Sequence, residues 1–144
     1  MARQDLKPLT VLHVEDDEND ALLLRRACEW AGLPVQLQHV PDGDTAQAYL
    51  LGTGDYADRE KHPLPHVVVL DLKMPRMDGF ELLKWLRAQS GFGSIPVLVF
   101  TSSLSRDDKA RALANGASSY FVKPATFEAL VSMVGSFGLP SDLN

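Results

Sequence analysis

Short runs of consecutive apolar residues recur along this chain, and segments with helically spaced apolar residues separate them. The clearest run, Val-Val-Val-Leu at residues 67–70, lacks the alternation of a half-buried strand. Such a run is typical of a strand covered on both faces, as in a parallel sheet with helices on either side. Because strand and helix signals alternate five times, the pattern predicts an α/β fold with a doubly wound, five-stranded parallel sheet.

The same pattern places the individual elements. Strands are predicted over residues 9–14, 35–40, 67–70, 96–100 and 119–122. Helices are predicted over residues 21–31, 44–51, 80–88, 105–115 and 126–137, with polar capping residues at several of their starts. The polar connection over residues 52–65 exceeds ordinary loop lengths, and is either functional or a tolerated surface insertion.

Length and composition indicate one domain. With 144 residues, of which 45% are hydrophobic and 23% charged, the chain has the make-up of a globular protein that can bury a core. We expect this core over about residues 8–138, followed by a short tail at residues 138–144. The single cysteine, Cys28, excludes an intramolecular disulfide and suits a reducing compartment.

Hydropathy and charge argue against two classes of partner. No apolar stretch approaches the length that spans a membrane, and the N-terminus lacks the apolar core of a signal peptide, so we expect a cytoplasmic location. The net charge is -5 and Lys and Arg form no cluster. Since a nucleic-acid backbone requires a basic surface, we expect no nucleic-acid partner.

Ionisable or polar side chains follow four of the predicted strands. Parallel strands meet at one edge of the sheet, and in open α/β sheets ligands bind at the carboxyl edge. Carboxylates gathered there repel one another unless a cation relieves them, and Mg²⁺ is a hard ion that takes oxygen ligands. An Asp can attack phosphorus, and a hydroxyl and an ammonium group can bind phosphoryl oxygens. The residues are Glu15, Asp16 and Asp17 after the first strand, Asp71 after the third, Thr101 after the fourth and Lys123 after the fifth.

Each of these residues alone has a plainer explanation. An Asp before a turn is usually a cap, a Lys after a strand is usually solvated, and Thr101 with the two serines after it suits a turn. Their joint occurrence at one predicted sheet edge favours a functional site.

With these residues in place, the chain resembles the receiver domain of two-component response regulators from about Pro8 to Phe137. The resemblance rests on four segments in order, at residues 14–17, 71–79, 100–102 and 116–124. It implies a single receiver domain over residues 1–144, with a flavodoxin-like sheet in the strand order 2-1-3-4-5.

The resemblance also implies the site. Asp71 would accept a phosphoryl group from a phosphohistidine of a sensor histidine kinase. Glu15, Asp16, Asp71 and the backbone carbonyl of Lys73 would organise Mg²⁺, with Mn²⁺ as an alternative ion and with Glu15 acting through water. Asp17 would be peripheral. The protein would then be a signalling phosphoacceptor that catalyses only its own phosphorylation and dephosphorylation.

Three further residues take roles from the same resemblance. Thr101 and Lys123 would bind the phosphoryl oxygens, and the Lys123–Pro124 peptide bond would be cis. Tyr120 would swing inward when Thr101 moves towards the phosphoryl group, which makes the two residues a switch. The alternative for Tyr120 is an ordinary half-buried strand aromatic.

The connection at residues 52–65 and the lack of an attached output domain make the chain most similar to single-domain regulators associated with phytochrome-type sensor kinases. Chemotaxis-type single-domain regulators are the alternative. The last predicted helix carries apolar residues over an arc of about 200°, more than one sheet-facing side needs. We therefore expect a homodimer through the last strand and helix, unless the tail folds back over that helix.

Two other classes fit the same fold. A phosphotransferase or phosphatase of the haloacid-dehalogenase-like type would use Asp71 as nucleophile, but Lys73 stands where such enzymes carry a second carboxylate. A flavodoxin-like cofactor protein needs a phosphate-binding loop after the first strand, where the acidic residues 15–17 would repel phosphate.

Overall fold

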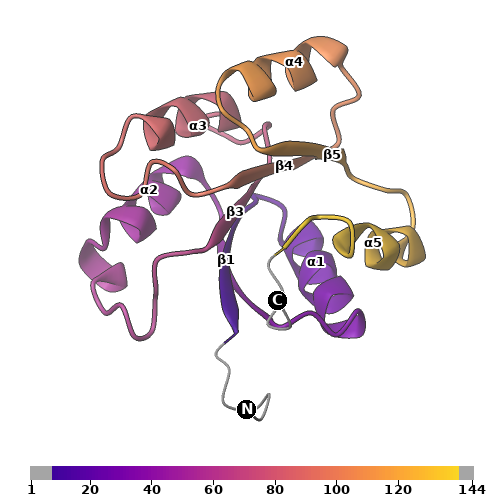
Figure 1. Ribbon diagram of the computed structural model, residues 1–144, viewed down its shortest axis with the longest axis horizontal. Coiled ribbons are helices and arrows are strands. Elements are labelled where there is room, and N and C mark those ends of the chain that lie inside the picture. The colour runs from indigo at the N-terminus through magenta and orange to yellow at the C-terminus, as the bar shows by residue number, and fades with distance from the viewer. Residues whose placement is uncertain (1–7, 140–144) are drawn as a thin grey trace.

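The computed structural model describes residues 8–139 and contains one parallel sheet of five strands in the order β2-β1-β3-β4-β5 (Figure 1). This order and the doubly wound architecture are those predicted from the sequence. The four residues of β3 are all buried, as expected for an apolar run between two helical layers. The strands are β1 (Leu9–Val14), β2 (Val35–Val40), β3 (Val67–Leu70), β4 (Val97–Thr101) and β5 (Ser119–Val122).

The five α-helices each begin after a polar side chain that accepts backbone N–H groups of the first turn. Two starts differ from the prediction because other carboxylates cap them. Asp17 caps the first helix three residues earlier than expected, and Asp42 rather than Asp44 caps the second. The last helix ends before the predicted Phe137. The helices are α1 (Glu18–Trp30), α2 (Gly43–Leu51), α3 (Gly79–Arg87), α4 (Arg106–Ala114) and α5 (Phe127–Val134).

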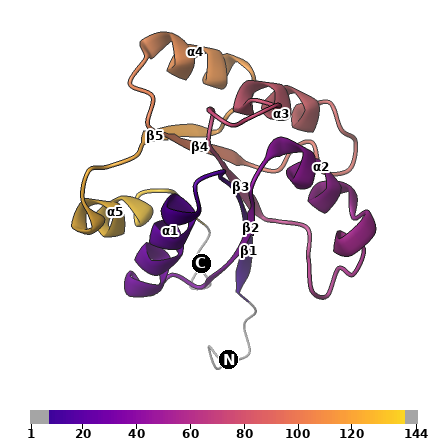
Figure 2. The same cartoon turned by 180° about the vertical axis from the view of Figure 1, so that it is seen from behind.

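The helices form two layers around the sheet (Figures 1 and 2). Helices α1 and α5 lie on one face, and α2, α3 and α4 lie on the other. Each layer closes a separate apolar core against the strands. Within residues 8–139, no helix has the length and apolar character needed to cross a membrane.

The connection between α2 and β3 is ordered and packed. It contains the short 3₁₀ helix η2 (Gly54–Tyr56), and the rings of Tyr49, Tyr56 and His62 contact one another at centroid distances between 5.0 and 5.7 Å. Arg59 donates hydrogen bonds of 2.8 Å to the carbonyls of Tyr49 and Leu50, at the end of α2. This packing gives residues 52–65 a structural role in closing the end of α2.

The register brings the carboxyl ends of the central strands together. Val14 at the end of β1 pairs with Leu70 at the end of β3, and Thr101 at the end of β4 pairs with Val122 of β5. The N–H of Asp71 donates to the carbonyl of Val14 at 3.1 Å. The polar residues that follow these strands therefore share one edge of the sheet, as predicted.

Candidate functional site

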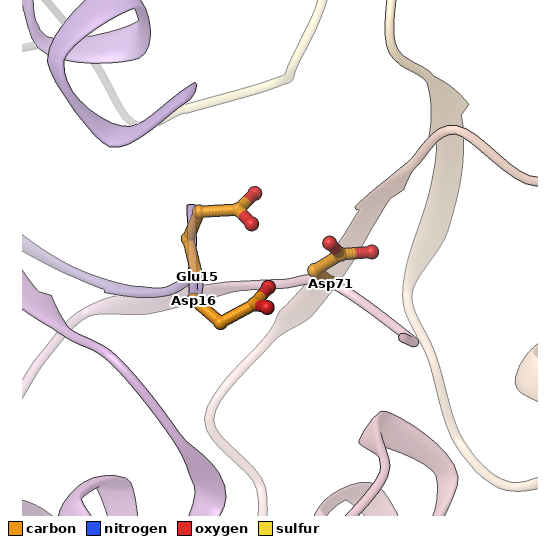
Figure 3. Close-up of side chains that lie close together, drawn as sticks. All are labelled: Glu15, Asp16 and Asp71. Carbon is orange, nitrogen blue, oxygen red and sulfur yellow. The ribbon is translucent and has the colours of Figure 1, made fainter. Parts of the chain in front are cut away.

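Three carboxylates from two strand ends form the centre of the site. Glu15 and Asp16 follow β1, Asp71 follows β3, and each offers one oxygen such that the three oxygens lie within 4.8 Å of one another (Figure 3). Glu15 and Asp71 are buried, whereas Asp16 is exposed. Three hard oxygen donors around a common space are the chemistry that Mg²⁺ or Mn²⁺ takes. The donor set of this acidic triad therefore fits a divalent metal ion, and one of its members, Asp16, faces solvent.

Lys123 supplies the positive charge beside the triad. Its Nζ lies 2.6 Å from Oε1 of Glu15 and 3.2 Å from Oδ2 of Asp71. The ammonium also lies 2.8 Å from Oδ2 of Asp20, in the first turn of α1. The structure thus brings Lys123 to the carboxylates as the sequence predicted, and adds Asp20, which the prediction missed.

Burial and these ion pairs set the charges of the site. Burial raises the pKa of Glu15 to about 7, although the hydrogen bond from Lys123 opposes this rise. For Lys123 burial disfavours the charge, but hydrogen bonds to Asp20 and Glu15 and the charge of Asp71 outweigh it, so its pKa lies above the ordinary value. Lys123 is therefore a permanent cation, while Glu15 can hold a proton near neutral pH.

Thr101 and Tyr120 lie on neighbouring strands next to the site. Thr101 is fully buried, and its Oγ1 accepts the N–H of Ser103 at 3.4 Å. Tyr120 is half-buried against the core that lies under α2, α3 and α4, and its hydroxyl donates to the carbonyl of Ser103 at 3.1 Å. Both residues of the expected switch, Thr101 and Tyr120, therefore form a hydrogen bond with Ser103 in the segment after β4.

The turn after β3 holds the Asp71 backbone tightly. The N–H of Gly79 donates to the carbonyl of Leu72 at 2.9 Å, and a Cβ at position 79 would lie 2.5 Å from the carbonyl oxygen of Asp71. No side chain fits there without displacing the backbone that carries Asp71. Lys73 lies within this turn, and its N–H donates to Oδ1 of Asp71 at 3.4 Å.

One expectation for the site is wrong. The Lys123–Pro124 bond is trans, and residues 8–139 contain no cis peptide bond. Asp17 was expected to be peripheral, and its Oδ1 accepts the N–H groups of Asn19 and Asp20 as the cap of α1.

Asp20 carries no signal in the sequence that connects it with the site. It lies in the first turn of α1, where an acidic residue is usually attributed to the helix dipole. Its partner, Lys123, is 103 residues away in sequence, so only the tertiary structure brings the two together.

A sequence profile described as the response regulator receiver domain matches residues 11–135. The chain is 38% identical over 126 residues to the probable methanogenesis regulatory protein FilR2 of Methanothrix harundinacea, a match that covers 85% of this chain and 77% of that protein. It is similar to the crystal structure of response regulator RPA3017 in red light signaling of R. palustris, with TM-score 0.84, 34% identity and coverage of 89% and 90%. The phosphorylated cyanobacterial phytochrome response regulator RcpA gives TM-score 0.81 and 29% identity, with 90% of each chain covered.

Proposed function

Because the chain belongs to the receiver domains of response regulators, we propose that Asp71 accepts a phosphoryl group from the phosphohistidine of a sensor histidine kinase. The observation that carries this assignment is the position of Asp71: a buried carboxylate inside the acidic triad, with the Lys123 ammonium 3.2 Å from its Oδ2. In the proposed reaction, an Asp71 oxygen attacks phosphorus. The bond between phosphorus and the histidine nitrogen breaks, and the nitrogen keeps the electron pair and takes up a proton.

The neighbouring residues of this chain would neutralise and orient the incoming group. Lys123 and Thr101 donate hydrogen bonds to the phosphoryl oxygens, which places a charged donor and a neutral one around the anion. Glu15, Asp16, Asp71 and the backbone carbonyl of Lys73 would hold Mg²⁺ or Mn²⁺, which supplies positive charge to the phosphoryl oxygens when bound. The same residues would serve dephosphorylation, a separate step in which water attacks phosphorus, the bond between phosphorus and the Asp71 oxygen breaks, and inorganic phosphate leaves.

The output of the reaction would be a change in the segment after β4. If Thr101 turns towards the phosphoryl group, the hydrogen bond that the Ser103 N–H donates to Thr101 Oγ1 changes, and the Ser103 carbonyl also accepts the hydroxyl of Tyr120. Thr101 and Tyr120 would then form the two-state element whose balance phosphorylation shifts.

The partner that we propose is a phytochrome-type sensor kinase, and the site of action is the cytoplasm. RcpA is a phytochrome response regulator and RPA3017 acts in red light signaling, and both match nearly the whole of this chain. FilR2, by contrast, is named as a probable methanogenesis regulatory protein.

Labelling with acetyl phosphate tests the assignment of Asp71. The wild-type protein should take up about one phosphoryl group per chain with Mg²⁺ and none with a chelator, because an anionic donor is repelled by uncompensated carboxylates. Asp71→Asn should abolish labelling. Asp78→Asn is the matched control, since Asp78 caps α3 in the same turn and Asn caps equally well. Undiminished labelling of Asp71→Asn would overturn the assignment, and continuous turnover of phosphate esters would favour a haloacid-dehalogenase-like enzyme.

A further inference from the structure

We propose that Asp20 is a positioning residue that keeps the Lys123 ammonium at the site when Glu15 and Asp71 are occupied by the metal. The inference rests on the proposed function, and concerns how Lys123 remains available for the phosphoryl oxygens. It depends on the three carboxylate partners of Lys123. Glu15 and Asp71 belong to the acidic triad, whereas Asp20 does not.

Two of the partners compete with the metal. Glu15 and Asp71 are members of the acidic triad, so the carboxylates that hold the ammonium at 2.6 and 3.2 Å are also candidate metal-binding groups. A divalent cation in that space would repel an ammonium group and compete with it for these carboxylates. Binding of the metal therefore weakens both contacts of Lys123.

Asp20 is the partner that the metal leaves in place. It lies outside the acidic triad, and its Oδ2 is 2.8 Å from Nζ of Lys123. Its backbone is fixed, because Asp17 accepts the Asp20 N–H at 3.1 Å as the cap of α1. The Asp20 side chain is 36% exposed and that of Lys123 15% exposed, so Asp20 holds the ammonium from the solvent side of the site.

Without Asp20, the long Lys123 side chain would lose its remaining anchor once the metal binds. It would then have to be ordered again in each phosphorylation event, at an entropic cost of the size known for Lys side chains. We expect Asp20→Ala to slow labelling by acetyl phosphate about tenfold at saturating Mg²⁺. Asp20→Asn keeps the shape and loses the charge, and should slow labelling in the same direction by a smaller factor.

The ammonium group itself provides a readout that is independent of activity. The ¹H–¹⁵N signal of the Lys123 side chain should be observable in the metal-free protein, because hydrogen bonding slows its exchange with water. When Mg²⁺ is added, the wild-type signal should shift and persist, since Asp20 still accepts its hydrogen bond. In Asp20→Ala the signal should disappear at saturating Mg²⁺. Glu18→Ala removes an equal charge from the same helical turn without a contact to Lys123 among the described residues, and should behave as wild type.

A double-mutant cycle separates positioning from a general effect of charge. If Asp20 acts through Lys123, Asp20→Ala should slow labelling of the Lys123→Ala protein by less than a factor of two. An equal slowing in both backgrounds, an equal effect of Glu18→Ala, or a persistent ammonium signal in Asp20→Ala would overturn the proposal. Failure of the wild-type protein to label at Asp71 would instead overturn the proposed function.

Discussion

His13 shows how one buried residue makes stability depend on pH. It lies in β1, is 1% exposed, and its Nδ1 has no hydrogen-bond partner among residues 8–139. Burial, followed by the charges of His39 and Lys123, lowers the pKa of His13 to about 3. The ring is therefore neutral in the folded protein at every pH at which the protein is expected to work.

The pKa of His13 predicts the direction of acid destabilisation. In the unfolded chain the ring binds a proton below about pH 6.5, whereas in the folded protein it does so only near pH 3. The unfolded state binds more protons between these values, so stability is full above pH 6.5 and falls as the pH decreases towards 3. Between pH 7 and pH 5, His13 should contribute a loss of about 2 kcal/mol in the free energy of unfolding.

Urea unfolding of the metal-free protein at pH 7 and pH 5 measures this contribution. The wild type should lose about 2 kcal/mol more than His13→Leu, which fills a similar volume without a titratable group. Glu15 also titrates in this range, but it is present in both proteins and cancels in the difference. Equal losses in the two proteins would contradict the prediction.

At the scale of elements, the hydrophobic pattern was sufficient to place every strand, and insufficient to place the helix starts. Apolar residues mark the sides of an element that are buried, but the first turn of a helix is fixed by a polar cap. In the chain, carboxylates at positions 16, 17, 42 and 44 all compete as caps. The structure uses Asp17 and Asp42, because these side chains reach the free N–H groups of the first turns.

In the first helix, the apolar pattern indicates which side faces the core, but packing decides which of those residues are buried. On a helical wheel Leu24, Ala27, Cys28 and Ala31 share one side of this helix. The first three are buried, but Ala31 is exposed at the end of the helix. Leu22 points away from that side on the helical wheel and is 43% exposed, and Leu23 beside it is 41% exposed. The α1 surface near the site therefore carries apolar side chains that the core does not use.

We predict that this surface of α1 binds the kinase. Leu22→Glu should lower the rate of phosphotransfer from the cognate kinase about tenfold, as expected for loss of an apolar side chain at the centre of an interface. Labelling by acetyl phosphate should not change, because the small donor needs no docking surface. Leu64→Glu is a matched control, since Leu64 is also 43% exposed but lies in the connection before β3. An unchanged rate with the kinase, in a folded Leu22→Glu protein, would rule out this docking site.

At the scale of the whole molecule, topology explains why the position of the site could be predicted and its inner contacts could not. The backbone register of the parallel strands places Glu15, Asp71 and Lys123 at one edge of the sheet, independently of the contacts that their side chains make. The partners of Lys123 depend instead on where α1 packs, since that packing brings Asp20 within 2.8 Å of the ammonium. The same holds for Tyr120, whose hydrogen bond to Ser103 joins two segments that no local pattern connects.

The structure also changes the argument for self-association. Much of the wide apolar arc of α5 is covered within the protein: Leu130, Val134 and the following Phe137 are buried, and Phe127 is 36% exposed. Leu139, at the start of the expected tail, packs against the same core, and the rest of the tail lies outside residues 8–139. Exposed apolar residues also lie before and within α4, which packs beside β5: Leu104 is 83% exposed and Leu113 is 43% exposed.

We still predict a homodimer through the last strand and helix, β5 and α5, and we now extend the predicted face to α4. In the described part of the chain, β5 has a strand neighbour on one side only, so its other edge is open to a partner. Tyr120 lies in this edge strand. A partner covering Leu104 and Leu113 would bury apolar area and would respond to a change at Thr101 and Tyr120. The dimer should therefore differ in strength between the unmodified and phosphorylated states.

Sedimentation at micromolar concentration, with and without a beryllofluoride mimic of the phosphoryl group, measures this assembly. The wild type should contain dimer in at least one state, and the mimic should change its fraction. Leu113→Glu should shift the protein towards monomer, because the new charge would be buried in the interface. Leu51→Glu serves as the control, since Leu51 is 52% exposed at the end of α2, away from this face. A strict monomer in both states, or equal effects of the two substitutions, would exclude the dimer on this face.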